Sequence, residues 1–324
     1  MHSYNLIAIL SLYILWCSAN NIEYNFASQS KSQLKEDILI HNHFFYGKRN
    51  GVVIESGALD GIKYSTTYAF HKILNWSSIH IEGDSENYYK LLQNRPDAIN
   101  IHAVLCSSKK DVHFLSHKSG GAVSGIREFM STSFLKWRYS NASDYMERVV
   151  TCVPLSELMA EHGINHANLW VLDVEGGELD VLRGIDFSMF SVDVILIETV
   201  SSESRFALSY LQSQRRYRCA VLPAHQFHIR NHVCVRSDFV PSSMKGIDVN
   251  DYLSRGVMTP LSRPNSPTYT TSPLKRSNQL SGGRKNGIVP ITPQKLSYKS
   301  GNTMTTPIVH KSIKKFTDKS GSGV

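Results

Sequence analysis

From about residue 40 to residue 240, short apolar runs rich in Val and Ile alternate with stretches that suit helices. Continuous apolar strands are buried on both faces, and helical connections between such strands are typical of a parallel sheet. The alternation predicts an α/β fold with a doubly wound, Rossmann-like sheet. The expected strands cover residues 51–56, 78–82, 100–105, 169–174 and 192–199, and the expected helices cover residues 66–74, 85–93, 155–162, 179–184 and 203–215.

The last part of this region departs from the alternation. Residues 217–222 and 232–235 have the pattern of two strands without a helix between them, which predicts a hairpin. We therefore expect a mostly parallel sheet with an antiparallel final strand. Such a topology does not determine function by itself.

The N-terminal end differs from this body. Residues 6–19 form a mostly apolar stretch without a charged side chain, and small residues stand near its end at Cys17-Ser18-Ala19. We expect residues 1–19 to be a cleaved signal peptide or an uncleaved signal-anchor. Residues 20–44 are expected to be a lead-in to a domain over residues 45–240. Sequons at Asn75 and Asn141 fit a secretory route.

The formal net charge of +8 comes from the C-terminal end. Residues 1–240 carry 22 Lys and Arg against 24 Asp and Glu, whereas residues 241–324 carry 13 against 3. Ser, Thr, Pro and Gly make up 38 of those last 84 residues, so we expect a disordered basic tail. The tail is either a solvated linker or a segment that contacts a membrane surface or another polyanion. Because the body is near neutral, we expect no specific nucleic-acid partner.

The first expected strand leads into the turn Glu55-Ser56-Gly57-Ala58-Leu59-Asp60-Gly61. Gly57 allows a tight turn with backbone close to a ligand, and Gly61 lets the chain swing toward the next helix. The third glycine of a dinucleotide-binding turn is missing, which disfavours a nicotinamide oxidoreductase. An acid such as Glu55 suits a ligand with an ammonium group. The alternative is an ordinary turn between a strand and a helix.

A second carboxylate, Glu82, ends the next expected strand. At the carboxyl end of a strand, a carboxylate can accept hydrogen bonds from both hydroxyls of a ribose. Taken alone, Glu82 could equally be a solvated loop acid. Together with Glu55 it indicates an aminoacyl-adenosine ligand, and therefore S-adenosylmethionine as the cofactor.

The fourth expected strand is followed by Asp173-Val174-Glu175-Gly176-Gly177-Glu178 and then a helix that contains Leu182. These residues resemble the D-V-E-G-x-E-x-x-L pattern of the FkbM-type methyltransferase family, and residues 53–61 and 81–82 resemble that family's donor site. The resemblance covers about residues 45–238. It implies a Rossmann-like methyltransferase that transfers a methyl group from S-adenosylmethionine to a hydroxyl oxygen, often on a glycan or other small hydroxylated acceptor.

The residues expected to bind the donor are Glu55, Gly57, Gly61, Ser65, Glu82, Ala103 and Val104. Asp173 and Glu175 are expected to lie on the acceptor side, since carboxylates at a strand's carboxyl end face the central crevice. The chemistry needs in-line positioning and removal of a proton from the acceptor, and either acid could be the base. The structural alternative is that acids here complement the N-terminus of the next helix. His80 and His117 are weaker candidates for the base.

Residues 107–150 form a long insertion between the third and fourth expected strands and read as irregular. They include the aromatic residues Phe129, Phe134, Trp137 and Tyr139. Loops outside strand ends usually carry specificity, so we expect an acceptor pocket or lid here. The alternative is that these aromatic side chains form a satellite core.

His225, His228 and His232 are clustered in the sequence. The region has the pattern of a hairpin rather than a helix, and no Cys pair with zinc-like spacing is near. We therefore expect no metal site.

Without the N-terminal segment four cysteines remain, Cys106, Cys152, Cys219 and Cys234, which allow three pairings. Cys219 and Cys234 lie on the two strands of the expected hairpin. In secreted members of the resembling family, cysteines are common at the places of Cys106 and Cys152, and the resemblance thus implies a disulfide between them. Buried free thiols are the alternative.

Two functions remain open at this stage. The first is an active O-methyltransferase of the secretory pathway. The second is a catalytically inactive binding module with the methyltransferase fold. Intact Glu55, Gly57, Gly61 and Glu82 favour retained donor binding in either case.

Overall fold

The computed structural model describes residues 25–118, 120–141, 143–199, 204–214, 216–222, 231–244 and 247–255. The expected signal segment, the tail beyond residue 255, and His225 and His228 lie outside these residues. Within the described chain, no helix is both long enough and apolar enough to cross a bilayer.

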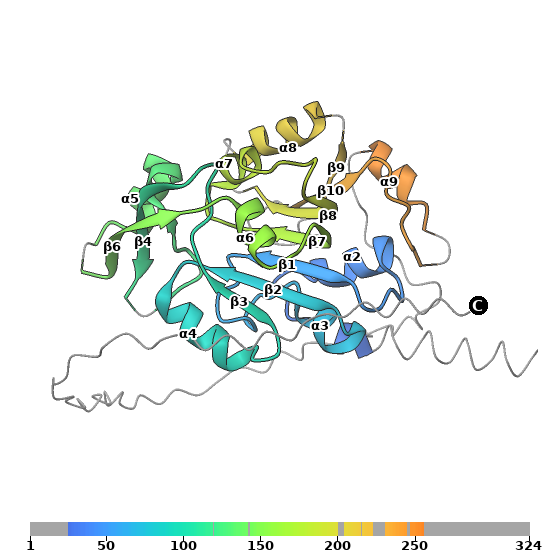
Figure 1. The fold of residues 1–324 in the computed structure, drawn as a ribbon, viewed down its shortest axis with the longest axis horizontal. Coiled ribbons are helices and arrows are strands. Elements are labelled where there is room, and N and C mark those ends of the chain that lie inside the picture. The colour runs from blue at the N-terminus through green and yellow to red at the C-terminus, as the bar shows by residue number, and fades with distance from the viewer. Residues whose placement is uncertain are drawn as a thin grey trace, which may run out of the picture. The chain divides into compact units, whose positions relative to one another are not determined.

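The described residues build a main sheet of seven strands (Figure 1). The strands are β1 (Val52–Ser56), β2 (Ser77–Glu82), β3 (Ile99–His102), β7 (His166–Leu172), β8 (Ser191–Glu198), β9 (Tyr217–Val221) and β10 (Asn231–Arg236). Their order is β3-β2-β1-β7-β8-β10-β9. The strand β10 runs antiparallel to both β8 and β9, and the pairs among β3, β2, β1, β7 and β8 are parallel. The predicted fold class and the predicted hairpin are confirmed.

Helices cover both faces of this sheet because successive strand residues point to opposite sides. In β7, Trp170 and Leu172 pack in one core cluster, whereas Leu169 and Val171 pack in the other. The first cluster contains residues of α6 (Leu155–Glu161), α7 (Glu178–Arg183) and α8 (Ser204–Ser213). The second contains residues of α2 (Glu36–Phe44), α3 (Tyr68–Leu74) and α9 (Val249–Arg255). A further helix, α4 (Ser85–Asn94), connects β2 to β3.

The insertion between β3 and β7 is not irregular, and that expectation was wrong. It forms a second, antiparallel sheet from β5 (Gly125–Ile126), β4 (Lys110–His117) and β6 (Tyr145–Cys152), in that order. A 3₁₀ turn, η1 (Arg127–Phe129), and the helix α5 (Thr132–Arg138) lie between β5 and β6. The longest pairing joins segments far apart in sequence, from Lys110 opposite Cys152 to His117 opposite Tyr145. Local composition does not reveal pairing of that kind.

Two disulfides join cysteines in the described part of the chain. Cys106 and Cys152 are bonded at the base of the insertion with their Cα atoms 5.7 Å apart, which confirms the predicted pair. Cys219 and Cys234 lie directly opposite each other on β9 and β10 and are also bonded. The structure thus has disulfides rather than free thiols at these four positions.

The folded domain extends beyond the expected boundary at each end. In the expected lead-in, Phe26 and Phe44 are buried in the second core cluster. In the expected tail, the Ser242 amide donates a hydrogen bond to the Phe44 carbonyl, and Val249 and Leu253 of α9 are buried in that same cluster. The polar composition averaged over residues 241–324 concealed a short apolar segment at its beginning.

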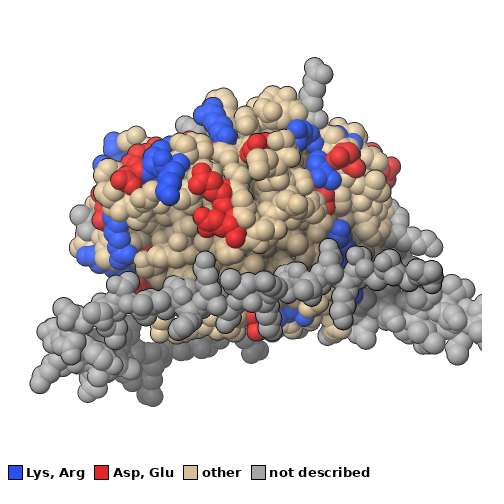
Figure 2. Space-filling model, viewed as in Figure 1, with Lys and Arg blue, Asp and Glu red and all other residues tan. Residues whose placement is uncertain are grey.

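The surface of the described body carries both signs of charge. In the face drawn in Figure 2, Lys and Arg side chains are interspersed with Asp and Glu side chains. This mixture agrees with the near balance of charge over residues 1–240.

We predict that a variant truncated after Asp238 is less stable than one truncated after Arg255. The shorter variant loses α9, and burial of Val249 and Leu253 contributes about 3 kcal/mol or more to the free energy of unfolding. Urea denaturation of the two variants measures the difference. Equal midpoints and equal slopes would show that α9 adds nothing to the core.

Candidate active site

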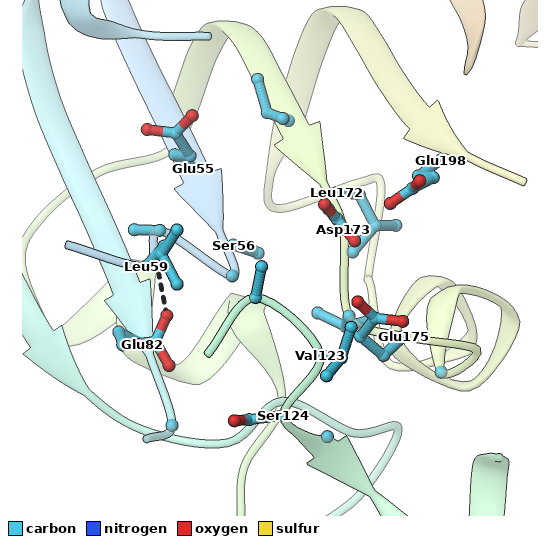
Figure 3. A pocket seen from close by; sticks show the side chains of 18 of the residues that line it. Glu55, Ser56, Leu59, Glu82, Val123, Ser124, Leu172, Asp173, Glu175 and Glu198 are labelled. Atoms are coloured by element: carbon cyan, nitrogen blue, oxygen red, sulfur yellow. Dashed lines mark hydrogen bonds between the residues drawn. The ribbon is translucent and has the colours of Figure 1, made fainter. Parts of the chain in front are cut away.

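A pocket of about 340 Å³ opens at the carboxyl ends of β1, β2 and β7 (Figure 3). This edge is where doubly wound sheets bind their ligands. The turns after β1, β2, β3 and β7 line the pocket, together with the end of β8. The insertion adds residues 121–126 and the side chains of Phe114, Phe129, Phe134 and Trp137.

The pocket brings together most of the residues expected to bind the donor. Those that line it are Glu55, Gly57, Ser65, Glu82, Ala103 and Val104. Gly61 is not among the lining residues. Its φ is 76°, and a Cβ at this position would lie 2.6 Å from a methyl carbon of Leu91 and 2.7 Å from Cγ of Arg95. Gly61 therefore permits close packing of the turn on α4.

Glu55 is a buried carboxylate held by the loop that follows the β1 turn. Its oxygens accept hydrogen bonds from the Ser65 hydroxyl, the Thr66 amide and the Thr67 hydroxyl, each at 2.7 Å. Burial raises the pKa of Glu55, and the Thr67 and Ser65 hydroxyls and the nearby Arg95 charge oppose that shift. Glu55 therefore orders the loop that forms one wall of the pocket.

Glu82 is the last residue of β2, the strand that pairs with β1. Its two carboxylate oxygens accept hydrogen bonds from the backbone amides of Leu59 at 2.7 Å and Asp84 at 2.8 Å (Figure 3). Burial raises the pKa of Glu82 to about 8. The two amides hold the carboxylate in one orientation at the wall of the pocket.

Gly57 brings the β1 turn against the β7 turn. Its φ is 80°, and a Cβ at this position would lie 2.0 Å from the carbonyl oxygen of Asp173. No side chain fits there. We expected a glycine here so that a ligand could approach the backbone. In the structure, it is the Asp173 carbonyl oxygen that leaves no space for a side chain at Gly57.

Carboxylates gather on the side of the pocket near β7 and β8 (Figure 3). Asp173 follows β7, and Glu198 ends β8. Their side chains are hydrogen-bonded, and burial together with the charges of Glu198 and Glu175 raises the pKa of Asp173 well above its usual range. The raised pKa favours a pair that holds one proton between the two carboxyl groups.

Glu175 lies beside this pair in a strained backbone conformation. Burial, followed by the charges of Glu198 and Glu178, raises the pKa of Glu175 to about 8. Its φ of 56° is in the left-handed region, which non-glycine residues occupy at a cost of about 1–3 kcal/mol. Glu178 accepts hydrogen bonds from the amides of Gly176 at 3.1 Å and Val174 at 3.3 Å. Glu178 thus fixes the turn before α7, and it lies with Asp180 in the first turn of that helix, where acids complement the helix N-terminus.

We did not predict Glu198 as a site residue. The sequence does contain a signal for it, because Glu198 is an acid at the end of an apolar strand, as Glu82 is. Glu36, which also lines the pocket and raises the pKa of Glu198, comes from the expected lead-in and carried no such signal.

The two histidines considered as bases do not line the pocket. His80 is buried, its ring nitrogens are within hydrogen-bond distance of Ser78 at 2.8 Å and Asn100 at 2.9 Å, and burial lowers its pKa well below the usual range. His117 lies on β4. Among the described residues no group of His, Cys, Asp and Glu is arranged to hold a metal ion. His232 is paired with the Thr199 hydroxyl at 2.9 Å.

The aromatic residues of the insertion divide between the two roles considered for them. Phe129, Phe134 and Trp137 line the pocket, and Trp137 is 73% exposed. Tyr139 is buried in a small cluster with Leu115 and Met130. The insertion thus forms both a pocket wall and a satellite core.

We predict that Glu175→Gln changes how the stability of the protein depends on pH. The folded pKa of Glu175, about 8, lies above the ordinary value of 4.5, so its contribution to stability is full below pH 4.5 and is lost as the pH rises through 8. Gln does not ionise. Between about pH 5 and about pH 9, the free energy of unfolding should therefore fall more in the unmodified protein than in the variant.

Urea denaturation at several pH values tests this. Glu161→Gln, at an exposed position of α6, is the matched control and should follow the unmodified protein. Parallel pH profiles for the unmodified protein and Glu175→Gln would contradict the raised pKa.

A scan against family models matches residues 55–225 with the Methyltransferase FkbM domain. No curated protein matches the chain. One similar solved structure is the methyltransferase FkbM from Methylobacillus flagellatus KT, with 11% identity, 67% of this chain and 59% of that chain covered, and a TM-score of 0.40. Another is the Aeropyrum pernix fibrillarin in complex with S-adenosyl-L-methionine, with 13% identity, 65% and 76% covered, and a TM-score of 0.37.

The pocket suits the methyl donor of this family. Glu82 is held with its carboxylate at the pocket wall, and a buried hydroxyl of another lining residue, Ser124 Oγ, has no hydrogen-bond partner within the described structure. These are groups that a ribose and an adenine can pair with. The family model covers more than half of the 324 residues, and this chain belongs to the FkbM family of S-adenosylmethionine-dependent methyltransferases.

Proposed function

We propose that the chain is an O-methyltransferase that acts on a hydroxyl of a glycan or another small hydroxylated acceptor. The observation that carries the proposal is that a single pocket has Glu82 in one wall and the acids Asp173, Glu175 and Glu198 in another (Figure 3). Bound S-adenosylmethionine supplies a methyl group on a sulfonium that is already activated for transfer. The protein has to position the acceptor oxygen and take up its proton.

The donor side is formed by Glu82 and by the loop that Glu55 orders. Each oxygen of Glu82 accepts one backbone hydrogen bond and keeps a further lone pair, which suits the two hydroxyls of a ribose. Glu55 accepts three hydrogen bonds, and a carboxylate has about four acceptor positions. The remaining position suits the ammonium group of the donor. Ser65, Ala103 and Val104 complete the proposed donor wall.

The acceptor side is formed by the paired acids and Glu175. The raised pKa of Asp173 favours a protonated carboxyl group beside Glu198, and such a pair can donate a hydrogen bond to a hydroxyl and accept one from it. Glu175 is the proposed base. A pKa of about 8 lies near neutral pH, where a carboxylate takes up a proton more readily than an ordinary acid does.

The aromatic residues at the pocket support a ring-shaped acceptor. Trp137 is largely exposed, and Phe134 packs against it with the ring centroids 6.0 Å apart. Exposed aromatic faces pack well against the apolar faces of sugar rings. This favours a glycan over an acyclic alcohol.

We predict that variants separate the two sides of the site. Glu82→Ala should weaken donor binding by about 1–3 kcal/mol, because its hydrogen bonds to the ribose hydroxyls are lost. Glu175→Gln should keep donor affinity and lower kcat about 100-fold, because the base is lost. Calorimetry with S-adenosylhomocysteine measures donor binding, and a screen with labelled donor over monosaccharides and glycans measures transfer and identifies the acceptor.

The outcomes distinguish the alternatives. Labelled methyl groups found on oxygen in the product would support the proposal, and methyl groups on nitrogen or carbon would contradict it. Donor binding without transfer to any acceptor in the screen would favour the inactive binding module. Full kcat in Glu175→Gln would assign the base to another group.

We also propose that the protein is made in the secretory pathway, on the evidence of the two disulfides, since such bonds persist in oxidising compartments. Full-length protein expressed in eukaryotic cells and alkylated before lysis should be recovered from the lumen or the medium. Peptide mapping without reduction should then show Cys106 linked to Cys152 and Cys219 linked to Cys234. Free alkylated thiols at all four positions would contradict this localisation. The contact of the basic tail with a membrane surface stays a prediction about residues outside the described structure.

A further inference from the structure

Residues 121–125 of the insertion, here named the strap, cross the pocket. At the beginning of the strap, the Asn87 side chain of α4 donates a hydrogen bond to the Gly121 carbonyl at 3.0 Å. At its end, a Cβ on Gly125 would lie 3.1 Å from Cβ of Glu175. In between, the Tyr139 hydroxyl donates a hydrogen bond to the Val123 carbonyl. The strap therefore runs from the helix after the Glu82 turn to the acids after β7.

The strap carries a buried hydroxyl that is not satisfied. Ser124 Oγ is shielded from solvent and has no hydrogen-bond partner within the described part of the chain, yet Ser124 lines the pocket. Buried polar side-chain atoms are nearly always paired, because an unpaired one costs about 1–3 kcal/mol. The other described atoms in this condition belong to Asp37, His43 and Arg95, none of which lines the pocket.

The direction of this hydroxyl distinguishes the two sides of the site. In Figure 3 the Ser124 oxygen points to the side on which Glu82 lies and away from the carboxylate of Glu175. A serine side chain is short, so its partner must be a group that lies directly beside the strap. The Glu82 side is where we have placed the adenosyl part of the donor.

We propose that the strap is a wall of the donor site and that the Ser124 hydroxyl hydrogen-bonds the adenosyl part of bound S-adenosylmethionine. The inference rests on the donor placement beside Glu82 in the proposed function. It gives the insertion a role in donor binding, in addition to the acceptor role expected for it.

Ser124→Ala tests the inference through two measurements, ligand affinity and melting temperature, which are expected to change differently. Binding of S-adenosylhomocysteine should weaken about 3- to 10-fold, as expected for the loss of one neutral hydrogen bond. The melting temperature without ligand should stay the same or rise, because the variant removes a buried hydroxyl that has no partner. Ser133→Ala, an exposed serine of α5 outside the pocket, is the matched control and should change neither.

Hydrogen exchange in the unmodified protein provides a second measurement that needs no variant. Amide exchange over residues 121–125 should slow when S-adenosylhomocysteine binds. Unchanged affinity in Ser124→Ala would overturn the role of the hydroxyl, and unchanged exchange over the strap would overturn its role as a donor wall. If Glu82→Ala binds more weakly while Ser124→Ala binds normally, the donor placement stands and this inference fails. If the unmodified protein does not bind S-adenosylhomocysteine, both fail.

Discussion

The backbone contact between Gly57 and Asp173 is the constraint on which the site depends. A Cβ on Gly57 would lie 2.0 Å from the Asp173 carbonyl oxygen, so the two turns meet without any side chain between them. The Gly57 amide donates to the Ile81 carbonyl of β2, and the Asp173 amide donates to the Ser56 carbonyl of β1. These bonds join the ends of three adjacent strands. The wall that carries Glu82 and the wall that carries the acids after β7 are therefore held at a set separation by backbone alone.

The buried acids of the pocket are stabilised in two different ways, and this difference separates their roles. Glu55 and Glu82 accept hydrogen bonds from hydroxyls and backbone amides, which fix their orientation. Asp173 has Glu198 as its partner, and the charges of Glu198 and Glu178 act on Glu175. Acids that are paired with donors are suited to hold a ligand. Acids whose neighbours are other acids are suited to exchange a proton with them or with an acceptor.

Those parts of the fold that rest on local periodicity could be predicted from the sequence. The turns at Glu55, Glu82 and Asp173 were located correctly, because each follows an apolar strand whose period is clear over a few residues. The sheet of the insertion was not, because β4 and β6 pair across a long stretch of chain and neither is apolar throughout. The packing of Val249 was missed for a related reason, since a short apolar segment is lost when composition is averaged over a polar tail.

The site was predicted less completely than the fold, because its members come from elements that are adjacent only in space. Ser124 carries no signal in the sequence, since an unpaired hydroxyl is defined by what surrounds it. Glu198 carried a signal through its strand, but its importance depends on the neighbouring Asp173, and β7 and β8 meet only in the folded sheet. Glu36 reaches the pocket from α2, which precedes the first strand.

The position of the insertion in the chain explains how it can touch both walls. It leaves the sheet after β3, at one edge, and the chain re-enters at β7, which is separated from β3 by β2 and β1. The helix α6 makes the crossover to β7, and residues 121–126 of the insertion line the pocket at the strand ends, where Glu82 and Gly57 lie. The disulfide between Cys106 and Cys152 joins the two ends of the insertion. The antiparallel sheet of the insertion is therefore fixed at these ends, and residues 121–126, which lie far from them in the sequence, line the pocket. Under the proposed function, changes in α5 or in the aromatic residues near it would alter which acceptor enters, while the strand ends that carry Glu82 and Gly57 stay in place.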